Sequence, residues 1–225
     1  MTLNSRIFSQ FLCSLLATAF LCSTTGCSLF VMAGKSLFGD PVMTAPFSHA
    51  ASVDLTKGEH RVVIVASTPQ TIQSEFPSTT IEMIEQVSRN LKANGVNVVS
   101  YNKVANWLDD NGGYWSDVDE LANAFETEYI IHLDIDSMTL QEPNSPDMYE
   151  GRVSGTIYGY EVRQGRKEKT AHRIFNQNFT RKYPDGYPQL ADRLSREEFH
   201  SELMEHICRA MAQQLYNHRP SDEFY

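Results

Sequence analysis

A chain of 225 residues with 41% hydrophobic and 21% charged residues has the composition of a folded globular protein, which argues against disorder throughout. Its 19 Lys and Arg are outnumbered by 28 Asp and Glu, so the net charge is −9. This charge repels polyanions, and no stretch of the sequence gathers the basic residues into a stripe, so we expect no nucleic-acid partner.

The N-terminus has the pattern of an export signal that ends at a cysteine. Arg6 is the only charged side chain before an apolar or small run, residues 7–21, and Gly26 directly precedes Cys27. This arrangement resembles the lipobox of bacterial lipoproteins, in which a small residue precedes a Cys that receives a diacylglycerol before cleavage. The resemblance implies that Cys27 is the lipid attachment site and that residues 1–26 are a signal peptide.

Two other interpretations of this segment stay open. No charged side chain stands between Arg6 and Lys35, so an uncleaved membrane helix is long enough to span, and ordinary secretion without an anchor is the second alternative. Each interpretation places the bulk of the chain outside the cytoplasm. Ser28 replaces the aspartate that retains some lipoproteins at the inner membrane, which favours the outer membrane and a domain facing the periplasm.

Regular structure is predicted to begin with a strand-helix-strand unit. The continuous apolar run 62–66 is typical of a strand that is covered on both faces. Thr79 with Glu82 three residues later gives the capping-box pattern of a helix start, and Gly95 is placed to end that helix. A second strand over 96–101 completes the unit and favours a parallel, right-handed crossover.

A second helix and three more strands follow in the sequence. Ser116 with Asp119 can start the helix. The strands are predicted at about 128–140, 150–163 and 172–183, with turn-forming residues between them. They form a meander, so the sheet should be mixed.

The final helix is the most clearly marked element. Ser195 and Glu198 form a capping box, and apolar residues recur every four positions after it. The predicted fold class is therefore α/β (α+β), with a mixed sheet of about five strands and three helices in the order β-α-β-α-β-β-β-α. The predicted organisation is a signal peptide (1–26), an apolar membrane-proximal segment (27–60), a single α/β domain (61–217) and a C-terminal tail (218–225).

Three possible metal ligands alternate along the third strand. On a strand, His132, Asp134 and Asp136 point to one face, whereas Leu133 and Ile135 point to the other. A metal site would need a fourth group, and the sequence nominates none. A solvated outer face is the competing interpretation of the same pattern.

Tyrosines and glycines give the meander its other features. Five tyrosines cluster in the meander half, and alternating tyrosines on a strand would form either a contact platform or a half-buried face; they are Tyr149, Tyr158, Tyr160, Tyr183 and Tyr187. Gly151, Gly155 and Gly159 leave the opposite face bare, which the close approach of the C-terminal helix or of another chain would explain.

The remaining histidines and cysteines do not suggest a catalytic centre. His200 and His206 are six residues apart, which is not the spacing of a helical metal pair, and we expect both on the surface. Cys208 stands alone in the last helix, where a buried apolar role is expected. No motif of a serine hydrolase or a zinc protease is present, so we expect no enzyme activity and no cofactor.

The order of elements, behind an apparent lipobox, resembles a class of envelope proteins. The features that carry the resemblance are the apolar strand from Arg61 to Val65, the helix that ends at Gly95, and residues 121–125 leading into 129–131. The class comprises the small α/β domains of curli-secretion and exopolysaccharide-secretion lipoproteins and the amino-terminal domain of the Tol-Pal periplasmic protein. More closely, the chain is similar to uncharacterised bacterial lipoproteins.

Together these features predict a lipid-anchored, non-enzymatic protein of the cell envelope. Its expected role is to bind another protein, or itself, during membrane assembly or secretion. A metal-dependent hydrolase that uses the strand from His132 to Asp136 is one alternative, and a binder of sugars or cell-wall fragments on the tyrosine-rich sheet is another.

Overall fold

The computed structural model describes residues 41–57, 60–142 and 145–219, so the proposed signal peptide and Cys27 lie outside the described residues. Thr44–His218 form one compact unit that contains the helices and strands described here. In chain order they are α2 (Pro46–Ala51), β1 (Arg61–Ser67), α3 (Gln70–Glu75), α4 (Thr79–Ala93), β2 (Asn97–Val98), α5 (Tyr101–Asp110), α6 (Val118–Ala124), β3 (Tyr129–Glu142), β4 (Ser145–Gln164), β5 (Lys169–Tyr183), β6 (Gln189–Leu190) and α7 (Arg196–Gln213).

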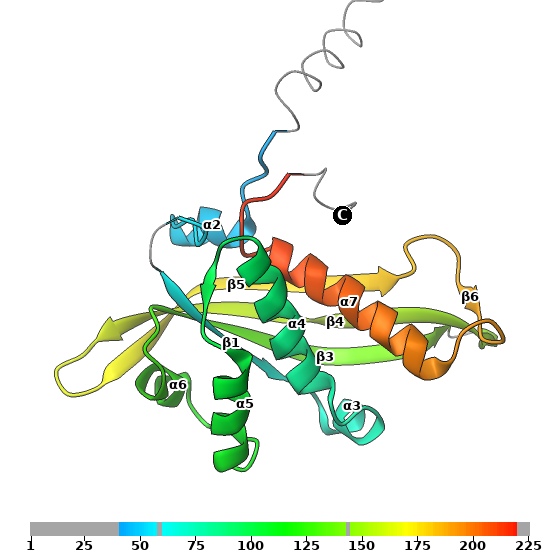
Figure 1. Ribbon diagram of the computed structural model, residues 1–225, viewed down its shortest axis with the longest axis horizontal. Helices are drawn as coiled ribbons and strands as arrows, with labels where there is room; N and C mark the ends of the chain where they lie inside the picture. Colours follow the sequence, from blue (N-terminus) through cyan, green and yellow to red (C-terminus); the bar gives the residue numbers. More distant parts are fainter. Residues whose placement is uncertain (1–40, 58–59, 143–144, 220–225) are drawn as a thin grey trace, which may run out of the picture. The chain divides into compact units, whose positions relative to one another are not determined.

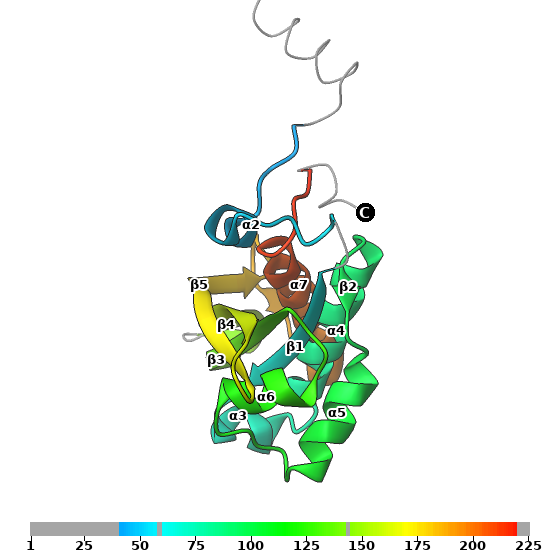
Figure 2. The ribbon, with the colours of Figure 1, turned by 90° about the vertical axis from the view of Figure 1, so that its left-hand side faces the viewer.

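The strands form one mixed sheet, which confirms the predicted fold class. Its order is β2-β1-β3-β4-β5 (Figure 2). The short β6 pairs with β4. β1 is parallel to both of its neighbours, whereas β3, β4 and β5 form the predicted antiparallel meander. β1 therefore lies in the centre of the parallel part, and its residues from Val62 to Ala66 are almost completely buried, as the apolar run predicted.

Two helices cover one face of the sheet. Figure 1 shows α4 and α7 in front of the long strands, and the two helices contact each other. Phe199, Leu203 and Ile207 of α7 are completely buried, so the predicted apolar stripe packs on the sheet. The capping box that begins this helix is confirmed, because Ser195 Oγ accepts from the Glu198 N–H and the Glu198 carboxylate accepts from the Ser195 N–H.

The three glycines of β4 permit close approach on the helix-covered face. A Cβ at Gly151 would lie 2.6 Å from Leu203 of α7, so the predicted approach of the C-terminal helix is confirmed there. A Cβ at Gly159 would lie 2.7 Å from Phe47 of α2. At Gly155 the nearest neighbour is instead the backbone of β3, at 2.2 Å from the Asp134 carbonyl oxygen.

Several helix boundaries differ from the sequence prediction. The strand predicted over 96–101 consists only of Asn97 and Val98, because the chain turns at Ser100 into α5, a helix that the sequence analysis did not predict. Thr79 is not an N-cap, since it is the buried first residue of α4 and the Glu82 carboxylate accepts from Ser78 Oγ instead.

Helix α6 also begins one residue later than predicted. Asp117 is its N-cap and accepts from the Asp119 N–H. Ser116, the predicted cap, instead donates from Oγ to the Glu120 carboxylate. The element was therefore predicted correctly and its first residue was not.

Candidate functional site

A cavity of about 450 Å³ lies where β1 ends. The chain leaves the sheet at Ser67 and runs into α3, and the loop between α5 and α6 forms the facing wall. The walls combine aromatic, hydroxyl and amide side chains, which are Tyr114, Trp115, Ser67, Thr68, Thr80, Gln73 and His132. Carboxyl ends of parallel strands are a common place for ligand sites in α/β sheets.

Ser67 joins two of the predicted site residues at this cavity. Val65 pairs with His132 and Ser67 pairs with Asp134, because β1 and β3 are parallel neighbours. Ser67 Oγ lies 2.7 Å from His132 Nε2 and donates to Asp134 Oδ1 at 2.6 Å. Ser67 was not predictable from the sequence, because only the pairing of the two strands brings it to His132.

The hydrogen bonds do not form a nucleophilic serine site. Since the single hydroxyl proton of Ser67 goes to Asp134, His132 Nε2 must carry a proton and donate it to Ser67 Oγ. A base that activates serine needs the opposite direction, with the carboxylate on the other ring nitrogen. Burial lowers the pKa of His132, and the Asp134 carboxylate opposes this shift. The three side chains therefore tie β1 to β3 and form a polar cavity wall.

The predicted alternation of His132, Asp134 and Asp136 is interrupted in the structure. A β-bulge lies between Ile135 and Ser137, and Asp136 is its extra residue. His132 is buried, Asp134 is half-buried and Asp136 is exposed. The interpretation of these three residues as a solvated outer face is therefore wrong for His132. Within residues 41–57, 60–142 and 145–219, no group of three or more His, Cys, Asp or Glu side chains is arranged to hold a metal ion.

Aromatic rings continue from the cavity onto the sheet. Trp115 meets the His132 ring edge-on at a centroid distance of 4.7 Å, and Tyr158 stacks on the His132 ring at a centroid distance of 5.8 Å. The Arg173 guanidinium lies over the Tyr158 ring at 5.7 Å. Tyr158 and Tyr160 are both half-buried, so the tyrosine pair lines a partly accessible surface.

These residues begin a polar surface that we call the open face, on the side of β3, β4 and β5 opposite α7. Its side chains are half-exposed or exposed, and include Thr139, Arg152, Ser154, Thr156, Tyr158, Arg173, Asn176, Asn178, Thr180 and Lys182. No helix among the described residues covers the middle of this surface. At one end, the Glu150 carboxylate pairs with Arg152 and Lys182.

Basic residues are frequent on β5 and on the turn before it, but neighbours such as Arg181 and Lys182 point to opposite faces of the sheet, so these residues form no single stripe. β5 contains Lys169, Arg173, Arg181 and Lys182 and has no acidic residue. Arg163, Arg166 and Lys167 precede it. Two of them are paired with carboxylates, Arg163 with Glu161 and Lys182 with Glu150.

The predictions for two residues of the last helix had different outcomes. His200 is buried, not on the surface, and its ring stacks on Phe76 at a centroid distance of 4.2 Å. His200 is buried because α7 packs beside α4, where the His200 ring approaches Thr79. Cys208 is completely buried as predicted, and burial raises the pKa of its thiol.

Similarity of this chain to known proteins is found among solved structures, at low identity. No protein-family model and no curated protein matches the chain. Similar solved structures include the PelC dodecamer from Paraburkholderia phytofirmans (14% identity, 78% of this chain and 97% of that chain, TM-score 0.41). They also include a minor lipoprotein from Acinetobacter baumannii (11%, 71% and 96%, 0.35) and lipoprotein GNA1162 from Neisseria meningitidis (10%, 68% and 99%, 0.36). Proteins named lipoproteins are thus among the structures that this chain resembles.

Proposed function

We propose that this chain is a lipid-anchored protein of the cell envelope, without enzyme activity, that binds a partner protein on the open face. The observation that carries the proposal is the asymmetry of the sheet. One face is buried by α4 and α7, whereas the opposite face of β3, β4 and β5 presents half-exposed aromatic and basic side chains. Tyrosine and arginine are among the side chains that are enriched at protein interfaces.

The anchor is supported by the residues around Cys27. Cleavage before this residue and acylation of its thiol would tether the domain, with residues 27–43 between the lipid and the compact unit. Within the described part of the chain, no helix is both long and apolar enough to cross a membrane. We further propose that the domain faces the periplasm from the outer membrane.

Intact-mass measurement of the protein extracted from membranes tests the anchor. The expected mass is that of a chain beginning at Cys27 with attached acyl groups, and the Cys27→Ala variant should lack both the cleavage and the lipid. A chain that retains Met1, or that stays in the aqueous phase of a detergent separation, contradicts the anchor.

Site-specific photo-crosslinking in cells tests the partner. A photoreactive residue in place of Thr156, at the middle of the open face, should give a discrete crosslinked species. The same residue in place of Glu197, an exposed position on α7, is the matched control. Equal products from both positions, or none from Thr156, contradict partner binding on the open face.

A second candidate function is favoured by the cavity at the end of β1. Its hydroxyl and amide groups beside Trp115 and Tyr114 suit a neutral polyhydroxylated ligand, such as a sugar or a cell-wall fragment. A thermal-shift screen with such compounds should then show stabilisation of the protein that is lost in Trp115→Ala. Equal shifts in both proteins contradict this candidate.

A further inference from the structure

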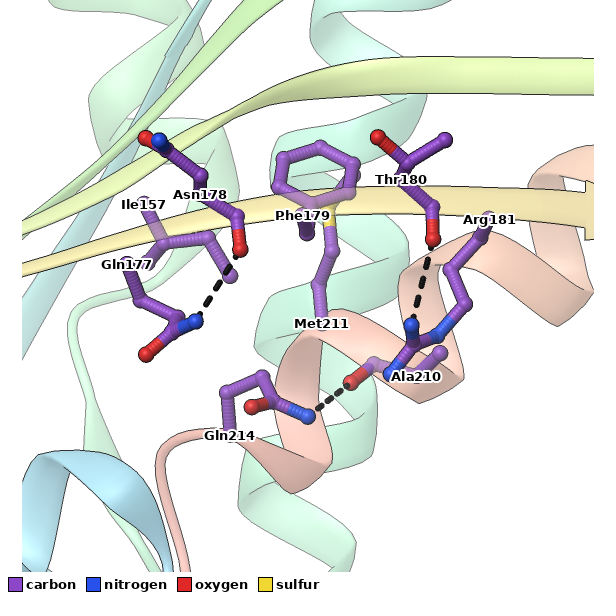
Figure 3. A pocket seen from close by; sticks show the side chains of 9 residues that line it. All are labelled: Ile157, Gln177, Asn178, Phe179, Thr180, Arg181, Ala210, Met211 and Gln214. Atoms are coloured by element: carbon purple, nitrogen blue, oxygen red, sulfur yellow. Dashed lines mark hydrogen bonds between the residues drawn. The ribbon is translucent and has the colours of Figure 1, made fainter.

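The outer edge of β5 presents backbone groups that no strand of the described chain occupies. In Figure 3 the side chain of Gln177 donates to the Asn178 carbonyl, and the side chain of Arg181 donates to the Thr180 carbonyl. These carbonyls therefore point away from β4. Since the N–H and C=O of one residue point to the same side in an antiparallel pair, the N–H groups of Asn178 and Thr180 point outward too.

The beginning of the same edge is closed by α6. The Asn123 side chain accepts from the Lys169 N–H and donates to the Lys169 carbonyl, so it imitates a paired strand. The Ala171 N–H donates to Asp119 Oδ1. The outward residues change from odd to even numbers because Ile174 is the extra residue of a β-bulge.

The two halves of the edge are therefore closed in different ways. At Lys169 and Ala171 the partners come from another helix. At Asn178 and Thr180 they are side chains of neighbouring residues in β5 itself, one half-buried and one exposed. An incoming strand can displace such local side-chain bonds at small cost, because it replaces each of them with a backbone hydrogen bond.

A cavity of about 120 Å³ lies beside this second half, between β5 and the end of α7 (Figure 3). Phe179, Met211 and Ala210 supply apolar walls, and Gln177, Arg181 and Gln214 surround them. The volume suits roughly one aliphatic side chain. A strand added to β5 would place alternate side chains on the α7 side of the sheet, beside this cavity.

The charge of the edge indicates the chemistry of the added strand. Arg181 forms no ion pair with any residue that the structure describes, and Arg173, on the same strand, lies over the Tyr158 ring. Lys182 is paired with Glu150, so Arg181 and Arg173 supply the positive charge of this edge. We propose that the edge from Asn176 to Lys182 accepts an extended acidic segment of a partner protein, with one aliphatic side chain in the cavity. This inference rests on the proposed partner-binding role and specifies that the partner binds by adding a strand to β5.

Peptide selection with a matched pair of variants tests the inference. Random peptides matched to the length of this edge would be displayed and selected on the full chain in detergent. Asn178→Pro removes the outward N–H, which an edge strand tolerates, whereas Asn178→Ala removes the same side chain and keeps the N–H. Selected peptides should be acidic with one aliphatic residue, and should bind Asn178→Pro at least about tenfold more weakly than Asn178→Ala.

Reversal of single charges tests the expected acidic character of the peptide independently. Arg181→Glu should weaken the selected peptides, whereas Arg166→Glu, which changes the same charge in the preceding turn, should not. The inference is overturned if selection yields no peptide, or if both members of either pair bind equally. Thermal melts of all four variants confirm that each is folded.

Two further measurements distinguish strand addition from self-association and from partner binding on the open face. Sedimentation without peptide should show the same oligomeric state for both Asn178 variants, and dissociation of Asn178→Pro alone would mean that a second copy occupies the edge, which overturns the inference. Crosslinking from Thr156 does not require the Asn178 N–H. Loss of peptide selection with persistent crosslinks therefore rejects only the strand addition, whereas bound peptides without crosslinks reject the proposed open-face partner.

Discussion

Replacement of Gly155 by alanine should strongly destabilise the fold. The added Cβ would lie 2.2 Å from the Asp134 carbonyl oxygen and 3.0 Å from the Ile135 Cα, both of which are backbone atoms. Strands β3 and β4 would have to separate by about 1 Å, because no rotamer change can relieve the contact. Overpacking of this kind costs typically 1–3 kcal/mol, and we expect about 3 kcal/mol because the obstacle is backbone.

Chemical denaturation followed by linear extrapolation measures this effect. For a domain of this size the expected loss corresponds to a fall in Tm of roughly 10 °C. Gly186→Ala is the control, since its Cβ would meet nothing within 4 Å, and it should change the free energy of unfolding by less than about 1 kcal/mol. Equal stability of the two variants would refute the argument that β3 and β4 touch at Gly155.

Three further predictions concern the last helix. Ser195→Ala removes the capping box with Glu198 and should cost about 1 kcal/mol of unfolding free energy, measured by denaturation; an unchanged midpoint would contradict the cap. Burial lowers the pKa of His200 below its ordinary 6.5. The folded protein is therefore destabilised as the pH falls below 6.5, because the unfolded chain takes up a proton on this residue more readily than the folded chain. His200→Phe should flatten this acid-side fall in the free energy of unfolding, and an identical pH dependence of the two proteins would contradict the prediction. Cys208, buried with a raised thiol pKa, should react with iodoacetamide at pH 8 only after unfolding, which mass spectrometry can follow; labelling of the native protein would contradict its burial.

Hydrophobic pattern and capping chemistry were sufficient for the main elements. The apolar run before Ser67 predicted a strand buried on both faces, and Ser195 with Glu198 predicted the start of α7. Both signals are local, so they are legible in sequence. Helix α5 was missed although Tyr101, Val104 and Leu108 recur at helical spacing, because the strand predicted over 96–101 was extended to the first residue of this helix.

The candidate site was less predictable, because it depends on contacts between distant segments. His132 was identified, but its partner Ser67 is 65 residues earlier and is found only from the register of β1 and β3. The bulge at Asp136 interrupts an alternation that looked regular in sequence. His200 was placed on the surface because a helical spacing alone does not show which neighbouring helix covers it.

The unequal lengths of the two outer strands have a consequence for polymerisation. β2 contributes only Asn97 and Val98, whereas β5 extends over 15 residues. A fibril grows by repeating the same contact, which requires each molecule to offer both a donor strand and an acceptor strand of comparable length. In the described part of this chain only one border is long enough, so strand addition at β5 would stop after a single step and would not propagate.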